Sequence, residues 1–519
     1  MGSKIVRGSV IIFAGNIIFR IGGYVYRFLM ATLLGPAQYG LLGITLPFQG
    51  IFQTLAAGGL PPAIAKYVAE YEALNEHDMA RQTIYTSLKI MVFLGFLMGF
   101  IMIFFAAPWL AYNYLGKPEA SMLLQIVGYI TPFSVIVGAF RGAFQGVYKM
   151  EYILYTRAIE QMAMILVATA FILIGLSVTG ALIGTVLGFA LASLSAVYIF
   201  KYHMAKYIPE STGNFVFTRK MELKLATKLV KFAIPVIITA IAEMLIYNVC
   251  TLVMGKYLTT TDVGYFAAVD SIARLPLMIS ISLATSILPA ASEAFATKDK
   301  DTLQNYVSLS YRYALLFVIP ICIGIARFSI PVLRIFYFTN SDYTNGALAL
   351  AILAIGMTFY SVFSISTSIV QGIGNPRIPM YILIFGVVVT TVCNIYMVQA
   401  YGIAGGSLAT TIACLAMMIP IVYLVFKLTD TKPPAISIGK IILASLIMGL
   451  ICCFIPKTIL GFIVALIITP FLYVVALVLL QFFTKDDLDN FRGYASKLGP
   501  LSGVFNKILD LVERIEFRN

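Results

Sequence analysis

The chain is poor in the residues that soluble enzymes use for chemistry. Charged residues make up 11% of its 519 residues, whereas a soluble domain carries about 25%. Its two histidines, His77 and His203, stand alone, which argues against a histidine metal site. The cysteines lack metal-ligand spacing and a paired disulfide framework, so we expect small core residues at Cys250, Cys322, Cys393, Cys414, Cys452 and Cys453.

The motifs of nucleotide and hydrolase chemistry are missing as well. The sequence contains no Gly-rich loop ending in Lys-Ser or Lys-Thr, no zinc helix with two histidines four apart and no Gly-x-Ser-x-Gly elbow. A membrane glycosyltransferase or polymerase would need a substantial outer loop with catalytic acids. The longest predicted outer loops, 107–120 and 327–346, supply only Glu119 and Asp342. We therefore expect no cofactor, no metal and no enzyme activity.

Apolar residues, in contrast, are abundant. They make up 60% of the chain, and the mean hydropathy is +0.93. Apolar runs of about 20 residues, each long enough to cross a bilayer, recur throughout. We predict an all-α integral membrane protein of about fourteen transmembrane helices, at residues 9–33, 41–64, 83–106, 121–140, 158–176, 179–200, 232–254, 264–291, 313–330, 347–370, 378–398, 403–426, 437–455 and 459–482.

The net charge of +13 is unevenly distributed between the predicted loops. Most lysines and arginines fall in the segments on the side of the N-terminus, which is the positive-inside pattern of cytoplasmic loops. The opposite side holds only Lys117, Lys256, Arg327, Arg334 and Lys457. We expect a multi-pass plasma-membrane protein with both termini cytoplasmic, and the charge then reports topology and not binding to nucleic acid.

The sequence repeats itself at an offset of about 225 residues. Segment 34–40 aligns with 258–264, 60–63 with 288–291, 145–146 with 371–372, and Gly180, Ala181 and Thr185 with Gly405, Gly406 and Thr410. An even number of spans per repeat implies two six-helix lobes related by a pseudo-two-fold axis along the membrane normal. Two further C-terminal helices complete the chain.

These features predict five regions. An N-terminal lobe (1–200) and a C-terminal lobe (232–428) flank a cytoplasmic linker (201–231), in which Pro209 and Gly213 interrupt helix formation. Two additional transmembrane helices (429–484) precede an amphipathic cytoplasmic tail (485–519), which we expect to lie along the inner membrane surface.

Polar side chains in the predicted spans point to a functional path. An arginine at the centre of a membrane helix costs about 2.5 to 3.5 kcal/mol, yet Arg20 lies near the middle of span one. Polar residues at helical spacing form polar faces on several spans. Facing lipid, these groups would stay unsatisfied, so we expect a hydrated cavity between the lobes. The residues that we expect to line it are Asn16, Arg20, Tyr24, Arg27, Gln49, Gln53, Glu243, Tyr247, Asp270, Arg274, Tyr360 and Gln371.

Several of these residues have simpler interpretations. Arg27 could extend its charge to the outer interface. Asp270 and Arg274, four residues apart, could form an ion pair or act separately. Glu243 could be a protonated core residue, a counter-ion to Arg20, or part of an ion-coupling site together with Asp270.

Segment 4–72 resembles the start of the polysaccharide exporter and oligosaccharide flippase family, in the branch with the stage V sporulation protein B group. The matching residues are Gly8, Arg20, Tyr26, Arg27, Leu34, Gly35, Pro36, Tyr39, Gly40, Gly58, Gly59, Pro61, Ala65, Lys66, Ala69, Glu70 and Tyr71. Gln371, Gly372, Gly374, Asn375 and Pro376 resemble that family's mark after span ten. The resemblance covers the whole chain and implies membership of the multidrug, oligosaccharidyl-lipid and polysaccharide exporter superfamily.

The resemblance implies a flippase that moves polyprenyl-diphosphate-linked sugars from the inner to the outer leaflet by alternating access. Family members that flip lipid II carry arginines in spans one and eight, and Arg20, Arg27 and Arg274 occupy comparable places. We expect these three to bind the diphosphate, in a monomeric transport unit surrounded by membrane lipids. No sodium-site motif stands out, so the coupling cation is open between proton and sodium. The main alternative is a multidrug or cation antiporter of the same superfamily.

Overall fold

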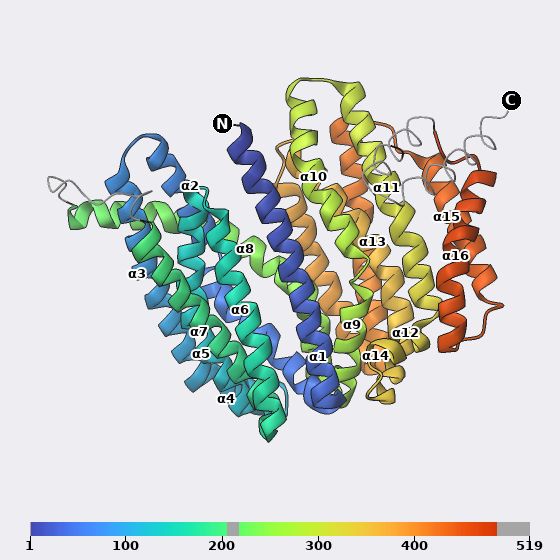
Figure 1. Cartoon of the computed structure of the whole chain (residues 1–519), viewed down its shortest axis with the longest axis horizontal. Helices are drawn as coiled ribbons and strands as arrows, with labels where there is room; N and C mark the ends of the chain where they lie inside the picture. Colours follow the sequence, from blue (N-terminus) through green and yellow to red (C-terminus); the bar gives the residue numbers. More distant parts are fainter. Residues whose placement is uncertain (1, 205–216, 485–491, 493–519) are drawn as a thin grey trace. The chain divides into compact units, whose positions relative to one another are not determined.

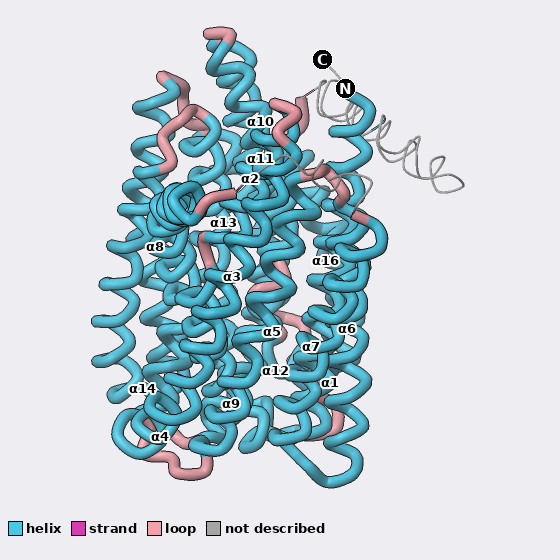
Figure 2. Tube along the Cα trace, turned by 90° about the vertical axis from the view of Figure 1, so that its left-hand side faces the viewer, coloured by secondary structure: helices cyan, strands magenta, loops and turns pink. Residues whose placement is uncertain are grey.

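The computed structural model describes the backbone at residues 2–204, 217–484 and 492, with side chains from Ile21 onward. Within these ranges the chain is helical and contains no strand, and Figure 2 shows helices joined by short connections. The predicted tail, apart from Arg492, lies outside the described residues. The prediction of an all-α membrane protein is confirmed.

The chain divides into two compact units, whose boundaries fall within helices. Unit 1 comprises residues 1–271 and 390–406, and unit 2 comprises residues 272–389 and 407–519. The six-helix lobes with their boundaries at 200, 232 and 428 stay a prediction. The helices of unit 1 are α1 (Gly2–Ala57), α2 (Leu60–Ala73), α3 (His77–Ile101), α4 (Ala107–Trp109), α5 (Ala120–Gly146), α6 (Met150–Phe171), α7 (Ser177–His203), α8 (Arg219–Tyr257) and most of α9 (Thr260–Ala273).

Unit 2 contains the remaining helices. They are α10 (Leu277–Ala296), α11 (Lys300–Arg327), α12 (Ser329–Phe336), α13 (Ala347–Gly372), α14 (Arg377–Thr429) except its middle segment 390–406, α15 (Ala435–Cys452) and α16 (Ile459–Leu479). Helices α15 and α16 correspond to the two predicted additional spans. The Tyr473 hydroxyl of α16 donates to the Leu316 carbonyl of α11 at 2.9 Å, which ties this pair to the rest of unit 2.

Eleven segments of the described residues are long and apolar enough to cross a membrane. Three of them exceed fifty residues, more than twice what a bilayer core of about 30 Å requires. Each contains a glycine with positive φ that interrupts the helix: Gly35 (72°), Gly175 (97°) and Gly402 (58°). A division at each glycine adds one span to the eleven, which would match the predicted fourteen. The count itself stays a prediction.

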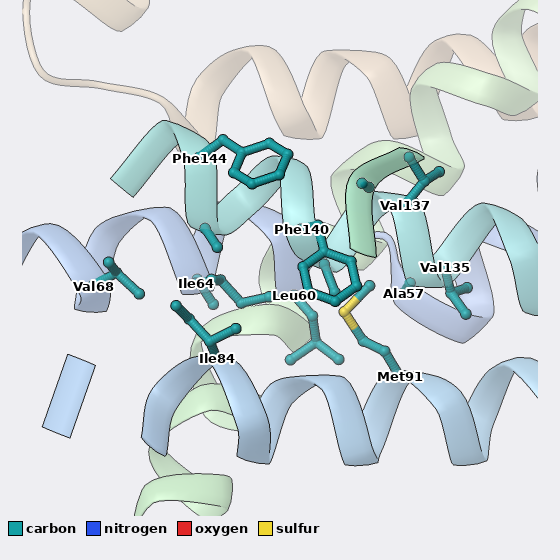
Figure 3. Packing of buried hydrophobic residues seen from close by; sticks show 14 of the residues in the cluster. Ala57, Leu60, Ile64, Val68, Ile84, Met91, Val135, Val137, Phe140 and Phe144 are labelled. Atoms are coloured by element: carbon teal, nitrogen blue, oxygen red, sulfur yellow. The ribbon is translucent and has the colours of Figure 1, made fainter. Parts of the chain in front are cut away.

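The core of unit 1 lies where α2, α3, α5, α7 and α8 meet. Leu60, Ile64, Ile84, Phe140 and Phe144 are buried there, as Figure 3 shows. Small residues bring the helix backbones close together, as is usual where lipid offers no hydrophobic drive for association. A methyl group on Gly99 of α3 would lie 2.9 Å from the Gly128 carbonyl of α5, and one on Gly184 would lie 2.5 Å from the Ala168 nitrogen.

Candidate functional site

The two copies of the sequence repeat cross each other within unit 1. Helix α1 turns at Gly35 and its second arm meets the start of α9. A methyl group on Gly40 would overlap the Thr260 carbonyl oxygen, and one on Gly264 would overlap the Pro36 carbonyl oxygen. In the repeat alignment, Gly40 corresponds to Gly264 and Pro36 to Thr260. The contact of Gly40 with Thr260 in one direction is therefore matched by the contact of Gly264 with Pro36 in the other.

Such reciprocal contacts are the signature of a two-fold axis. Gly43 supports the same interpretation, because its added methyl would lie 3.5 Å from the Cβ of Ala267, its own counterpart in the repeat. A residue that touches its symmetry mate lies at the axis. This crossing, formed by Pro36, Gly40, Gly43, Thr260, Gly264 and Ala267, is called the glycine crossing below.

Two predicted site residues lie near the glycine crossing. Tyr39 is buried at 5% exposure, and its hydroxyl hydrogen-bonds Ser271. The charges of both Arg27 and Asp270 reach this hydroxyl. The charges of the span-one arginine and the span-eight aspartate, both in unit 1, therefore act on the same tyrosine. Arg27 itself is exposed and Asp270 is half-buried.

A second polar group follows the antiparallel contact of α1 and α8. Three contacts show that the two helices run in opposite directions: Ile44 with Gly255, Gly50 with Met244, and Gly59 with Ala233. Relative to Gly50, Gln49 lies one residue before and Gln53 three residues after, and Glu243 and Tyr247 have the same offsets from Met244. In antiparallel helices equal offsets point to the same side of the contact line. The four polar residues therefore share one side of the helix pair.

Glu243 is exposed, while Gln49, Gln53 and Tyr247 are half-buried. A carboxylate beside two amides and a phenol can accept hydrogen bonds or take up a proton or a small cation. Among the residues that the structure describes, no three His, Cys, Asp or Glu side chains gather closely enough to hold a metal ion.

The remaining predicted residues are distributed as follows. Tyr24 stacks on Phe28 with ring centroids 6.3 Å apart. The side chains of Asn16 and Arg20 lie outside the described residues, although both belong to α1. Unit 2 holds Arg274, Tyr360 and Gln371. Arg274 is half-buried and its charge reaches the buried Cys414 thiol, and Tyr360 is 8% exposed and packs on Phe363. The roles of these residues stay predictions.

A polar cluster that was not predicted from the sequence lies between α5 and α6. Arg141 Nη2 donates to Glu160 Oε2 at 2.7 Å, and Arg141 Nε donates to Thr156 Oγ1 at 3.0 Å. The arginine and glutamate side chains are only 17% and 8% exposed. Arg157 lies within reach of both charges. The predicted topology counted Arg141 and Arg157 as loop charges, but α5 continues to Gly146 and α6 begins at Met150.

The same cluster borders α1. The Gln161 side chain contacts Gly22 so closely that a methyl there would lie 2.8 Å from Gln161 Cγ. Its amide nitrogen is buried without a hydrogen-bond partner among the described residues. The spacing of Arg157, Glu160 and Gln161, which puts three polar side chains on one helix face, was the signal in the sequence that could have revealed this cluster.

Comparison with known proteins extends these observations. Lipid II flippase MurJ of Bacillus subtilis is 26% identical over 463 residues, covering 81% of this chain and 82% of that protein. Stage V sporulation protein B of Bacillus subtilis is 29% identical over 331 residues, covering 60% and 62%. Among solved structures, lipid II flippase MurJ in an inward closed conformation has a TM-score of 0.73 at 19% identity, covering 91% of this chain and 98% of that one.

Family models match two parts of the chain. The MatE model matches residues 235–397. The model described as polysaccharide biosynthesis protein matches residues 5–295, which is more than half of the chain. The chain belongs to the polysaccharide biosynthesis protein family, and with it to the superfamily of multidrug, oligosaccharidyl-lipid and polysaccharide exporters.

Proposed function

We propose that this protein is a flippase that moves a polyprenyl-diphosphate-linked oligosaccharide or cell-envelope precursor from the inner to the outer leaflet of the plasma membrane. The observation that carries the proposal is the convergence of Arg27 and Asp270 on Tyr39 beside the glycine crossing, in a chain of this family. The relatives named as flippases support a lipid-linked substrate.

The chemistry of such a substrate explains the arginines. A lipid diphosphate carries at least two negative charges, and moving it through hydrocarbon without partners would leave several polar groups desolvated. Guanidinium groups hold phosphate oxygens with two parallel hydrogen bonds, which lysine does not reproduce. In this proposal Arg20, Arg27 and Arg274 bind the diphosphate inside a hydrated cationic cavity, and the polyprenyl chain stays in the bilayer.

Alternating access would turn about the glycine crossing. Because its contacts are reciprocal between the repeats, two lobes can rock against each other there while the backbones stay close. With both termini cytoplasmic, the turn of α1 at Gly35 marks the outer membrane face. The crossing then closes the outer side while the substrate enters from the inside.

We assign the energy for resetting the cycle either to the membrane potential or to a cation bound near Glu243 or Asp270. Glu243 and Asp270 are the acids of unit 1 that belong to the two polar groups described above. Uptake of a proton or sodium ion at Asp270 would remove a negative charge beside Arg27 and so favour binding of the anionic head group, and loss of that cation would favour its release.

A flipping assay in proteoliposomes tests the proposal. Arg20→Lys and Arg27→Lys keep the charge but lose the bidentate geometry, so each should slow translocation of a fluorescent polyprenyl diphosphate sugar about tenfold or more. Arg334→Lys on α12, an exposed arginine outside the proposed path, is the matched control. Full translocation by both arginine variants at equal folded expression would remove these residues from the binding site.

A second candidate function is a multidrug or cation antiporter, which the MatE match to residues 235–397 favours. Its cavity would need to attract cations, so acidic residues and not arginines would dominate binding. The same proteoliposomes discriminate between the two: transport of a cationic dye under a proton or sodium gradient, without translocation of any lipid diphosphate, would establish the antiporter.

A further inference from the structure

The first half of α8, residues 219–232, differs from the membrane-spanning helices. It runs crosswise to the long helices of unit 1, as Figure 1 shows at the left and Figure 2 shows end-on. Thr218 caps its start by accepting a hydrogen bond from the Met221 amide. Leu225 and Leu229 are buried in the core cluster of unit 1. This segment is therefore a surface helix anchored by one apolar face.

The opposite face of this segment is cationic. Residues 220, 224, 228 and 231 recur at spacings of four, four and three, which places them along one helix face. They are Lys220, Lys224, Lys228 and Lys231, all exposed, and together with Leu223 and Thr227 they line a shallow groove of about 510 Å³. These four lysines are called the lysine face below.

The protein neutralises only part of this charge. Lys228 Nζ lies 3.3 Å from Glu70 Oε1 and 4.2 Å from the centroid of the Tyr67 ring. Glu222 points the other way and pairs with Lys89 of α3 at 2.7 Å. Within the described parts of the chain, Lys220, Lys224 and Lys231 form no ion pair with an acid. Three positive charges thus line one groove without an acidic ion-pair partner among the described residues.

Apolar side chains border the lysine face along one edge. Leu223, Val230 and Ile234 are 70%, 39% and 50% exposed. At 100° per residue they lie together, between the lysine face and the buried face. A helix with a cationic face and an exposed apolar edge suits the headgroup region of a membrane, where the apolar edge enters the acyl boundary.

We propose that the first half of α8 is a docking surface for anionic phospholipids of the adjacent leaflet. The lysine face binds their phosphate groups, and Leu223, Val230 and Ile234 contact the upper part of their acyl chains. Free phosphate would satisfy the lysines but leave the apolar edge in water. A second copy of this chain would bring an equal positive charge to the same surface and be repelled.

Native mass spectrometry of the full-length protein tests this docking surface. The protein is purified in micelles that contain equal amounts of phosphatidylglycerol and phosphatidylcholine, and the retained lipids are counted. We expect phosphatidylglycerol to be preferred. The triple variant Lys220→Gln, Lys224→Gln, Lys231→Gln should bind phosphatidylglycerol at least about tenfold more weakly, because each lysine near an anionic membrane surface adds to the attraction.

The matched control removes the same net charge elsewhere. Lys298, Lys427 and Lys432 are exposed residues of unit 2, and their replacement by glutamine should leave the preference unchanged. Equal loss in both triple variants, or no loss in either, would overturn the proposal. Displacement of the lipid by inorganic phosphate at equal concentration would also overturn it, because the apolar edge would then contribute nothing.

Salt dependence provides a second measurement that needs no variant. Raising the ionic strength from 0.1 to 1 M shortens the screening length from about 10 Å to about 3 Å. In the unaltered protein, the amount of phosphatidylglycerol retained should then fall toward the amount of phosphatidylcholine retained. A preference that does not change with salt would overturn the proposal even if the triple variant failed to fold. Neither measurement depends on which substrate the protein transports.

Discussion

Two ion pairs of unit 1 have the same length but different surroundings. Arg141 to Glu160 and Lys89 to Glu222 both measure 2.7 Å. The side chains of the first pair are 17% and 8% exposed, and those of the second are 69% and 32% exposed. Burial strengthens attraction between the charges and also raises the cost of leaving either one alone. Burial, and not distance, therefore decides how much the stability of the protein depends on an ion pair.

The largest expected effect comes from breaking the buried pair. Glu160→Leu should lower the free energy of unfolding by about 3 to 5 kcal/mol, because it leaves the Arg141 guanidinium buried without its counter-charge. Reversible unfolding in mixed micelles measures this change. The double variant Arg141→Met, Glu160→Leu should recover most of the loss, since a buried pair can often be replaced by apolar residues. If the double variant is as unstable as Glu160→Leu, the unpaired charge of Arg141 is not the cause of the lost stability.

At the glycine crossing, close packing of two backbones, and not a buried charge, leaves no room for change. Gly40→Ala and Gly264→Ala should each destabilise the protein by about 1 to 3 kcal/mol, because the added methyl meets a backbone carbonyl that cannot move aside easily. The repeat predicts that the two variants behave alike. Thermal unfolding of the purified protein checks both.

Open glycines provide the matched controls for this prediction. A methyl group on Gly23 or Gly324 would meet nothing within 4 Å. Alanine at these helical positions should leave stability unchanged or raise it by up to about 1 kcal/mol. Destabilisation by the controls equal to that at the crossing would mean that helix propensity and lipid contacts, and not close approach, determine the result.

Much of the fold could be predicted from the sequence, because its signals are local. Apolar runs of membrane length follow from hydropathy, whereas the positive φ of Gly35, which glycine adopts without steric cost, was seen only in the structure. Hydropathy, however, ends a span at its first charge, while helical hydrogen bonding continues beyond it. This is why α8 begins at Arg219 although the predicted span begins at 232, and why Arg141 and Arg157 were assigned to loops.

The site was predictable only in part, because contacts between distant helices leave little trace in one sequence. Polar spacing along α1 and α8 indicated Gln49, Gln53, Glu243 and Tyr247, but nothing in it revealed that they share one side of a helix pair. The pairing of Arg141 with Glu160 required the approach of α5 to α6. The repeat was the exception, since two aligned copies predicted an axis that the reciprocal contacts of Gly40 and Gly264 support.

The smallest expected effect comes from the exposed pair. A double-mutant cycle with Lys89→Gln and Glu222→Gln should give a coupling energy of about 0.2 to 1 kcal/mol, because water already solvates both groups and salt screens them. Measurement at 0.1 and 1 M salt should show the coupling fall. Lys300 and Asp430, paired at 2.7 Å in unit 2 with still greater exposure, should couple more weakly than Lys89 and Glu222. A coupling at Lys89 as large as that at Arg141 would contradict the dependence on burial, because the two pairs share the same distance and differ in their access to water.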